Sequence, residues 1–240
     1  MNLRVLQRGF NYSQDGPGNR LVYHLQGCNL HCPWCSNPES MSPDGGEETS
    51  CEALVRQCVA AEPMFFDSGG VTFTGGEPTV QFEALKAVLA GLKENNIHTA
   101  IETNGTNPRL PKLFELVDFL IMDFKHYDSD KLKSFTGVGN NILKKNIISA
   151  AEKRTQLLLR IPLIKGFNAS TVDAERFCEF LKPIWHSGIK LELLRYHEYG
   201  KDKWLYTGME YKMQDAFVSD ELFEEICTIF KSNSITLIKT

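Results

Sequence analysis

The sequence predicts an α/β protein in which a parallel sheet is covered by helices. Short β-rich runs alternate with helical patterns along the 240 residues, and this alternation is typical of repeated strand–helix units. Clusters of polar residues and glycine follow the strand runs, where parallel sheets carry their functional loops. Both a partial barrel and an open doubly wound sheet satisfy this pattern.

The expected elements follow from composition and hydrophobic periodicity. The expected strands are Arg20–Gln26, Val71–Thr74, His98–Thr103, Phe119–Phe124, Gln156–Pro162 and Ile189–Leu194. The expected helices are Cys51–Ala61, Thr79–Asn95, Pro108–Leu116, Ile142–Lys153, Ser170–Lys182 and Ser219–Lys231. Thr49 and Glu52 have capping-box spacing, which favours a helix start at that point. The pattern therefore predicts six strand–helix units.

Each expected strand is followed by a polar or glycine-containing loop. These loops are Gly27–Cys35, Gly75–Glu77, Thr103–Gly105, Asp123–His126, Lys165–Phe167 and Arg195–Gly200. Because parallel strands end at the same edge of a sheet, we expect the loops to converge on one site.

Composition and charge exclude several classes of protein. The chain has 26 Lys and Arg against 30 Asp and Glu, so its net charge of −4 indicates no nucleic-acid partner. No run approaches the ~18 consecutive apolar residues of a membrane span. The first residues, MNLRVLQRGFNYSQ, lack the apolar stretch of a signal peptide. We therefore expect a cytoplasmic protein without membrane association.

The cysteines carry the strongest chemical signal in the sequence. The seven are Cys28, Cys32, Cys35, Cys51, Cys58, Cys178 and Cys227. An odd number without a secretion signal argues against a disulfide framework. The first three form a CxxxCxxC motif, and thiolates select zinc, copper or iron–sulfur clusters. A [4Fe–4S] cluster normally takes four cysteines, so three would leave one iron with an open position.

Three interpretations of this motif compete. The cysteines could form a structural zinc site completed by His31 or His24, or they could be packed at this spacing by chance. The third is a [4Fe–4S] cluster with one open iron, which we favour because a second motif accompanies the first. This motif is Gly75-Gly76-Glu77-Pro78, whose glycines allow a backbone to approach a ligand closely. It also suits a simple strand-to-helix turn that Pro78 opens.

The CxxxCxxC motif, with Trp34 before its third cysteine, resembles that of radical S-adenosylmethionine (SAM) enzymes. Further segments are similar, in the same order, to glycyl-radical-enzyme activating enzymes of the pyruvate formate-lyase type. These segments are Asp15–Arg20, Trp34–Ser40, Thr74–Pro78, Met122–Lys125, Arg160–Gly166 and Leu194–Trp204. The resemblance covers roughly residues 10–210. It implies a partial (β/α)6 TIM-type barrel in a single radical SAM domain, residues 1–240, with a cluster loop at 27–36 and a C-terminal extension from about 205.

The resemblance implies an oxidoreductase that cleaves SAM reductively at a [4Fe–4S] cluster held by Cys28, Cys32 and Cys35. The resulting 5′-deoxyadenosyl radical would abstract a glycine hydrogen from a partner glycyl radical enzyme. A flavodoxin or ferredoxin would supply the electron, because such clusters lie at about −400 mV or below. We expect anaerobic chemistry and a monomer. The segment after Cys35 resembles the branch with a ferredoxin-like insert, but too few cysteines follow it here, so we expect a single cluster.

The resemblance also implies the residues of the site. The cofactor-binding set is Trp34, Ser36, Gly75, Gly76, Glu77, Thr103, Asn104, Asp123, Lys125, Arg160 and His197. A Na⁺ or K⁺ site is implied at Glu102, Thr103 and Asp123, although the relatives usually have aspartate at the position of Glu102. Candidates for gripping the partner's glycine loop are Asp15, Gly16, Lys201 and Trp204.

Two other functions remain open at the level of the sequence. The first is a radical SAM enzyme that acts on a small molecule, for example a deazapurine-type carboxylate synthase. The second is a zinc-binding interaction module, which would share the cysteines but would not need the Gly-Gly-Glu-Pro motif. Iron–sulfur colour in an anaerobic preparation separates the enzymes from the zinc module.

Overall fold

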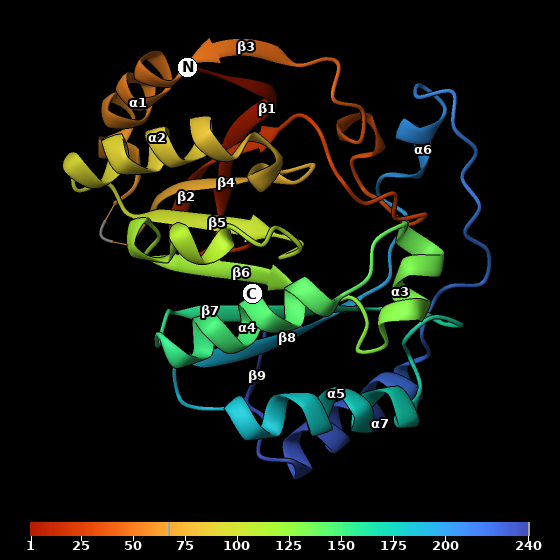
Figure 1. Cartoon of the computed structure of the whole chain (residues 1–240). Helices are drawn as coiled ribbons and strands as arrows, with labels where there is room; N and C mark the ends of the chain where they lie inside the picture. The colour runs from red at the N-terminus through yellow and green to blue at the C-terminus, as the bar shows by residue number, and fades with distance from the viewer. Residues whose placement is uncertain (67, 240) are drawn as a thin grey trace.

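The computed structural model describes residues 1–66 and 68–239, and in this part of the chain nine strands form one sheet. Their spatial order is β3-β1-β2-β4-β5-β6-β7-β8-β9 (Figure 1). The strands are β1 Asn2–Tyr12, β2 Asn19–Leu25, β3 Glu47–Ser50, β4 Gly70–Gly75, β5 Thr99–Thr103, β6 Phe119–Asp123, β7 Leu157–Leu163, β8 Ile189–Arg195 and β9 Leu237–Ile238.

The strand order decides between the two sheet types. From β2 to β9 all neighbouring strands are parallel. When β3 at the edge is set aside, each strand lies beside the strand that precedes it in the chain. A doubly wound sheet reverses its order at a switch point, whereas a barrel adds each strand in turn. Antiparallel β1 and β3 extend the β2 edge, and the described sheet ends at β3 and β9 without pairing them. The expected partial barrel is confirmed.

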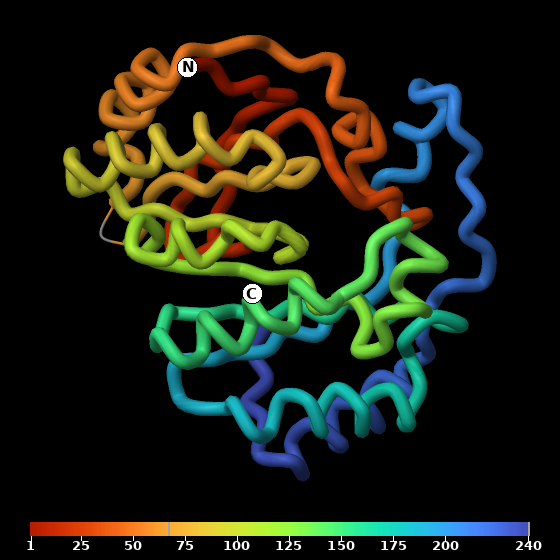
Figure 2. Tube along the Cα trace, viewed as in Figure 1, coloured from red at the N-terminus to blue at the C-terminus, as the bar shows by residue number. Residues whose placement is uncertain are grey.

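Most of the helices cover the outer face of the sheet. The α-helices of the described residues are α1 Cys51–Ala60, α2 Phe82–Glu94, α3 Ser129–Thr136, α4 Asn141–Glu152, α5 Thr171–Leu181, α6 Lys201–Trp204 and α7 Asp220–Ser232. The longer helices α1, α2, α4, α5 and α7 lie along the outside, whereas α3 and α6 lie at the end of the sheet where β2 leads into its loop (Figure 1). After α6 the chain runs down the outside to α7, as the blue tube shows (Figure 2). No helix in the described ranges is long and apolar enough to cross a membrane.

Strand alternation separates an apolar outer face from a polar inner face. In β4, Val71 and Phe73 belong to the core under the helices, and Thr72 and Thr74 fall on the other face. The inner face consequently carries buried polar groups, among them Arg20 in β2 and Arg160 in β7. This face forms the interior of the partial barrel.

The turn between β1 and β2 folds against the inner face. The hydroxyl of Thr72 donates a hydrogen bond of 2.7 Å to the carbonyl of Asp15, and Nε of the fully buried Arg20 donates to the same hydroxyl over 2.7 Å. Gly16 is buried with a φ of +123°, and a Cβ there would lie 3.2 Å from Arg20 Cδ. Asp15 and Gly16 are therefore fixed at the opposite end of β2 from the cysteine loop.

Most expected elements are present, and one expected helix is wrong. The segment Pro108–Leu116 forms two 3₁₀ turns, Leu110–Lys112 and Phe114–Leu116. Pro111 lacks an amide hydrogen and disfavours helical geometry at the residue before it, so a continuous α-helix does not form. The helix expected from Thr79 begins with a 3₁₀ turn before α2. The cap of α1 is Ser50, which accepts from the amide of Ala53. The elements that the sequence analysis missed are β1, β3, β9, α3 and α6.

Candidate active site

A cavity of about 260 Å³ lies at the carboxyl ends of the parallel strands. Its lining comes from β2, β4, β5, β6, β7 and β8 or from the loops that follow them. Of the residues predicted from the sequence, the lining includes Cys28, Cys32, Trp34, Cys35, Ser36, Gly75, Gly76, Glu102, Thr103, Asn104, Asp123, Lys125 and His197. The loops thus converge on one site, as the strand pattern indicates.

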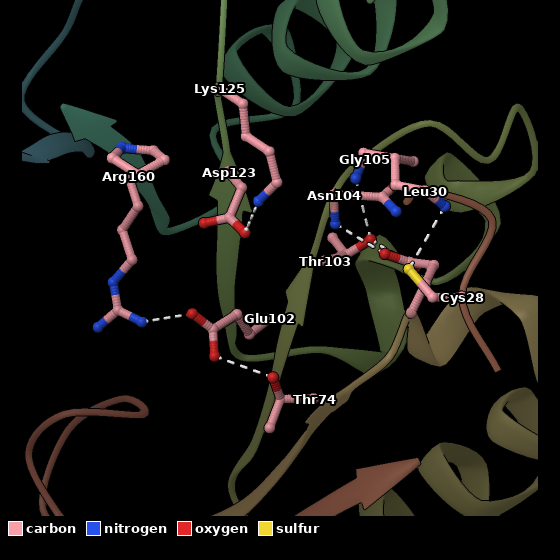
Figure 3. A network of polar contacts seen from close by, with 12 residues as sticks. Cys28, Leu30, Thr74, Glu102, Thr103, Asn104, Gly105, Asp123, Lys125 and Arg160 are labelled. Carbon is pink, nitrogen blue, oxygen red and sulfur yellow. Dashed lines mark hydrogen bonds and ion pairs between the residues drawn. The ribbon is translucent and has the colours of Figure 1, made fainter. Parts of the chain in front are cut away.

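The three motif cysteines lie at this cavity. Backbone amides donate to two of the sulfurs over 3.4 Å, from Leu30 to Cys28 (Figure 3) and from Asn37 to Cys35. Burial raises the pKa of Cys28 and Cys32 to about 12 and also raises the pKa of Cys35. The three thiols are therefore neutral at pH 7, and binding of a metal centre would release their protons.

The cavity presents three thiols, which is the donor set of a [4Fe–4S] cluster with one open iron. In the described part of the chain, no group of three or more Cys, His, Asp or Glu side chains could hold one metal ion. A zinc ion needs its ligands to converge on one atom, whereas a [4Fe–4S] cluster binds each cysteine through a different iron. His31, one of the two candidates for a fourth zinc ligand, is exposed. These residues fit a cluster that is held by three thiolates.

Cys51 and Cys58 take no part in this site. Both are buried in the apolar core under the helices, where α1 packs against α2. The sequence analysis gave them no ligand role.

The two glycines of the Gly-Gly-Glu-Pro motif allow two backbones to meet. Gly75 has a φ of +113°, and a Cβ there would lie 2.2 Å from the amide nitrogen of Leu25. A Cβ at Gly76 would lie 2.2 Å from the carbonyl oxygen of Gly27. The close approach expected from these glycines is thus made to the base of the cysteine loop, within the chain itself.

Glu77 is buried behind the cavity wall and does not line it. Its Oε1 accepts from the amide of Thr79 over 3.0 Å and from the hydroxyl of Thr103 over 2.7 Å, and its Oε2 accepts from the amide of Asn104 over 2.7 Å. Burial raises the pKa of Glu77, and these donors oppose the rise. Glu77 therefore ties the loop after β4 to the loop after β5, which carries Asn104 into the cavity.

Three ion pairs lie on the inner face, and Figure 3 shows those of Lys125 with Asp123 and of Arg160 with Glu102. Lys125 Nζ lies 2.5 Å from Asp123 Oδ2, and this carboxylate raises the pKa of Lys125 against the effect of burial. Arg160 Nη1 lies 2.5 Å from Glu102 Oε1, and Arg160 Nε lies 3.0 Å from Glu192 Oε2. Arg160 also donates to the carbonyl of Gln14. The guanidinium thus lies between two carboxylates and does not line the cavity that it was expected to reach.

The three residues expected to bind a monovalent cation already have partners in the protein. Oε2 of Glu102 accepts from the hydroxyl of Thr74 over 3.0 Å, so both of its oxygens are engaged. Burial raises the pKa of Glu102, while Arg160 lowers it. The Thr103 hydroxyl donates to Glu77, and Asp123 contacts Lys125.

Trp34 and His197, which line the cavity, each pack against a neighbouring aromatic ring. Trp34 packs on Phe167 with ring centres 4.7 Å apart. His197 stacks on Tyr199 at 4.2 Å, and burial lowers the pKa of His197, so the ring is neutral at pH 7. Tyr199 is 86% exposed, so a solvent-facing ring lies directly against a cavity residue.

The four residues predicted to grip a partner are not brought together. Asp15 and Gly16 lie at the far end of β2, and exposed Lys201 pairs with Glu198. Trp204 is only 6% exposed, and its indole Nε1 donates to the carbonyl of Cys35 over 3.0 Å. The hydrogen-bond partner of this indole is therefore in the chain itself.

Some cavity residues were not predicted as site residues: Leu30, Asn37, Met41, Thr74, Pro162, Ile164, Leu194, Arg195 and Tyr196. All of them except Met41 lie within the cysteine motif or the segments that carry the family resemblance, which is the signal that could have found them.

The chain is similar in sequence and in fold to known proteins. A family model described as the radical SAM superfamily matches residues 22–178. The chain is 32% identical to the 4-hydroxyphenylacetate decarboxylase activating enzyme of Clostridioides difficile (strain CD196), over 92% of this chain and 90% of the relative. It is also 32% identical to the pyruvate formate-lyase 1-activating enzyme of Escherichia coli (strain K12), over 83% of this chain and 82% of the relative.

A solved structure agrees. A domain of a pyruvate-formate lyase-activating enzyme from Bacteroides vulgatus ATCC 8482 superposes with a TM-score of 0.58 at 29% identity, over 71% of this chain and 98% of that one. The alignment with the C. difficile relative spans 288 positions, more than the 240 residues of this chain, so that relative carries additional residues. The chain belongs to the radical SAM superfamily and, within it, to the family of these activating enzymes.

Proposed function

We propose that this chain activates a partner glycyl radical enzyme by reductive cleavage of SAM at one [4Fe–4S] cluster. The observation that carries the proposal is the cavity itself. It brings the CxxxCxxC cysteines together with the loops after β4, β5, β6 and β8 in a chain that is 32% identical to two activating enzymes. When bound, the cluster and SAM supply the electron and the 5′-deoxyadenosyl radical that abstracts a glycine hydrogen from the partner.

The chain's own residues would hold and orient these groups. Cys28, Cys32 and Cys35 would hold the cluster through three of its irons, and the fourth iron would be free to bind the methionine end of SAM. The cavity volume of about 260 Å³ lies near the lower end of the range for small-molecule sites. Lys125 places a positive charge in it, held by Asp123, which suits a carboxylate or a ribose hydroxyl. Glu77 would not touch the cofactor itself, because it acts by holding the backbone amide of Asn104.

The aromatic rings and the second ion pair complete the proposed binding site. Trp34 flanks the adenine, and neutral His197 offers either a donor or an acceptor to SAM. Arg160 acts through Glu102, which it contacts, rather than by touching the cofactor. A Na⁺ or K⁺ ion at Glu102, Thr103 and Asp123 stays a prediction, and SAM affinity measured in potassium, sodium and choline salts tests it.

The partners follow from the same chemistry. A flavodoxin or ferredoxin reduces the cluster, and the enzyme works as a cytoplasmic monomer. The glycine loop of the partner reaches the cavity past Tyr199 and Lys201. Asp15 and Gly16, at the opposite end of β2, provide a second contact for the partner. The proposal includes no nucleic acid and no membrane.

Anaerobic reconstitution tests the function. We expect about four irons and four sulfides per chain, a reduced-state EPR signal that SAM alters, and a glycyl radical EPR signal after incubation with a candidate partner. Candidate partners are glycyl radical enzymes encoded by neighbouring genes. A colourless protein that binds one zinc ion would refute the proposal, and so would a loaded enzyme that leaves SAM intact.

A further inference from the structure

We infer that the segment Gly200–Trp204 clamps the cysteine loop, and that Trp204 is a positioning residue for the third cysteine. This inference rests on the proposed cluster but not on the identity of the protein substrate. It replaces the expectation that Trp204 contacts the partner.

The first contact of the clamp is made by Trp204. Its indole Nε1 donates to the carbonyl oxygen of Cys35 over 3.0 Å, and the residue is 6% exposed. A buried indole N–H requires an acceptor, and this carbonyl supplies it. The ring of Tyr211 packs edge-on against the indole, with ring centres 5.6 Å apart, and so fixes its orientation.

Two other residues, Lys203 and Gly200, extend the clamp beyond Cys35. Lys203 Nζ donates to Asn37 Oδ1 over 2.7 Å and lies 3.2 Å from Glu39 Oε1. Gly200 lies against the backbone of Ser36 so closely that a Cβ there would be 2.4 Å from Ser36 Cα. Three residues of the clamp therefore contact the chain between Cys35 and Glu39.

The far side of the cysteine loop is held by α3. The amide of His31 donates to the carbonyl of Thr136, the last residue of α3, over 2.9 Å. The loop is thus held between α3 and α6, which lie at the same end of the sheet (Figure 1). Neither helix was expected from the sequence.

The clamp acts on the sulfur through the backbone. The amide of Asn37 donates to Cys35 Sγ over 3.4 Å, and Trp204 and Lys203 hold the residues on either side of that bond. Hydrogen bonds to the sulfurs are among the features that set the potential of an iron–sulfur cluster. Loss of the indole donor would therefore loosen Cys35 and alter the cluster that it binds.

The test uses the full chain, reconstituted anaerobically, with Trp204→Phe, which keeps an aromatic ring and removes the N–H donor. We expect iron and sulfide contents equal to those of the wild type. Release of iron to a chelator should be about fivefold faster, the size expected for one lost hydrogen bond. The EPR signal of the reduced cluster should also change. Tyr206→Phe, at a ring that is 89% exposed and lies two residues beyond the clamp segment, should change neither.

Two further variants keep the test decisive. Ile226→Val, in the buried core face of α7 and outside the clamp, controls for a general loss of stability and should not accelerate iron release. Lys203→Met removes the contacts to Asn37 and Glu39 at a half-exposed position and should accelerate release about twofold, even if Trp204→Phe fails to fold.

The clamp is refuted if release stays at the wild-type rate in both clamp variants, or if Ile226→Val accelerates it equally. Failure of the proposed function gives a different result. A wild-type chain that holds the cluster but activates no partner would refute the function and leave the clamp supported by its release rates. A chain that holds no cluster would refute both.

Discussion

The indole nitrogen of Trp204 and the carbonyl oxygen of Cys35 are 3.0 Å apart, although 169 positions separate them in the sequence. This hydrogen bond joins the loop after β8 to the loop after β2, so the last and first of the six predicted parallel strands contribute to one structure. The cavity is lined by both of these loops and by the carboxyl ends of the strands between β2 and β8. The integrity of the site therefore depends on contacts between its loops as well as on the cysteines.

Replacement of Cys32 by alanine should abolish SAM cleavage without unfolding the chain. Cys32 is buried at the cavity, and a cluster with two thiolates left would not be retained. Iron content, chromatography of 5′-deoxyadenosine and circular dichroism measure the three outcomes. Cys51→Ala, at a buried cysteine of the α1 core, is the matched control and should keep its iron. Turnover that persists in Cys32→Ala would contradict the ligand role.

Replacement of Arg160 by methionine should lower the free energy of unfolding by about 3–5 kcal/mol, because the buried Glu192 and the partly buried Glu102 lose a cationic partner. Glu102 and Glu192 both contact this guanidinium. Urea denaturation measures the effect. Arg176→Met removes an exposed pair with Glu179 and should cost no more than about 0.5 kcal/mol. Equal losses of unfolding free energy in the two variants would contradict a larger contribution from the ion pairs of Arg160.

Replacement of Gly75 by alanine should destabilise the protein by more than about 3 kcal/mol, or prevent folding, since the Cβ would lie 2.2 Å from the amide nitrogen of Leu25. Gly166→Ala is the control. Gly166 also has a positive φ, +80°, but nothing lies within 4 Å of its Cβ position, so only backbone strain of about 1 kcal/mol remains. The difference in melting temperature between the two variants isolates the close approach. A tolerated alanine at position 75 would argue against it.

Stability should fall as the pH drops below about 6.5, in part because of His126. Its Nδ1 accepts from the amide of Asp128, and its Nε2 donates to the carbonyl of Phe167, so the folded protein holds a neutral ring. Burial lowers the pKa of His126, and Lys131 adds to this, whereas the contact with Phe167 and the charges of Asp173 and Asp128 oppose it.

The sign of this effect follows from proton binding. Below the pKa of the unfolded state, the unfolded chain takes up a proton that the folded chain resists, so the free energy of unfolding falls by at most about 1.4 kcal/mol per pH unit. The stabilising contribution is complete above pH 6.5 and is lost towards the lowered pKa of the folded state. Urea midpoints at pH 7.5 and 5.5 measure the slope, which should be smaller in His126→Gln. An unchanged slope in that variant would rule His126 out.

The sequence by itself determined the six parallel strands from β2 to β8, the five longer helices and the edge at which the functional loops meet. All of these follow from local information, because hydrophobic periodicity fixes each element and parallel strands share one carboxyl edge. The motif cysteines and Gly75, Gly76, Asp123 and Lys125 could thus be assigned to one cavity in advance. The wrong helix at Pro108–Leu116 also had a local cause, in the weight given to apolar spacing over Pro111.

Only the tertiary structure decided which polar side chains face the cavity and which act behind its wall. Thr103, Glu102 and Cys35, which bond to Glu77, Arg160 and Trp204 respectively, lie 26, 58 and 169 positions from them in the sequence. No pattern within one element reports such separations. Each of these side chains must satisfy its hydrogen-bonding groups once it is buried, and the fold supplies partners inside the protein. Glu77 fixes a loop, Arg160 lies between two carboxylates and Trp204 holds Cys35, since burial leaves a polar group no alternative to an internal partner.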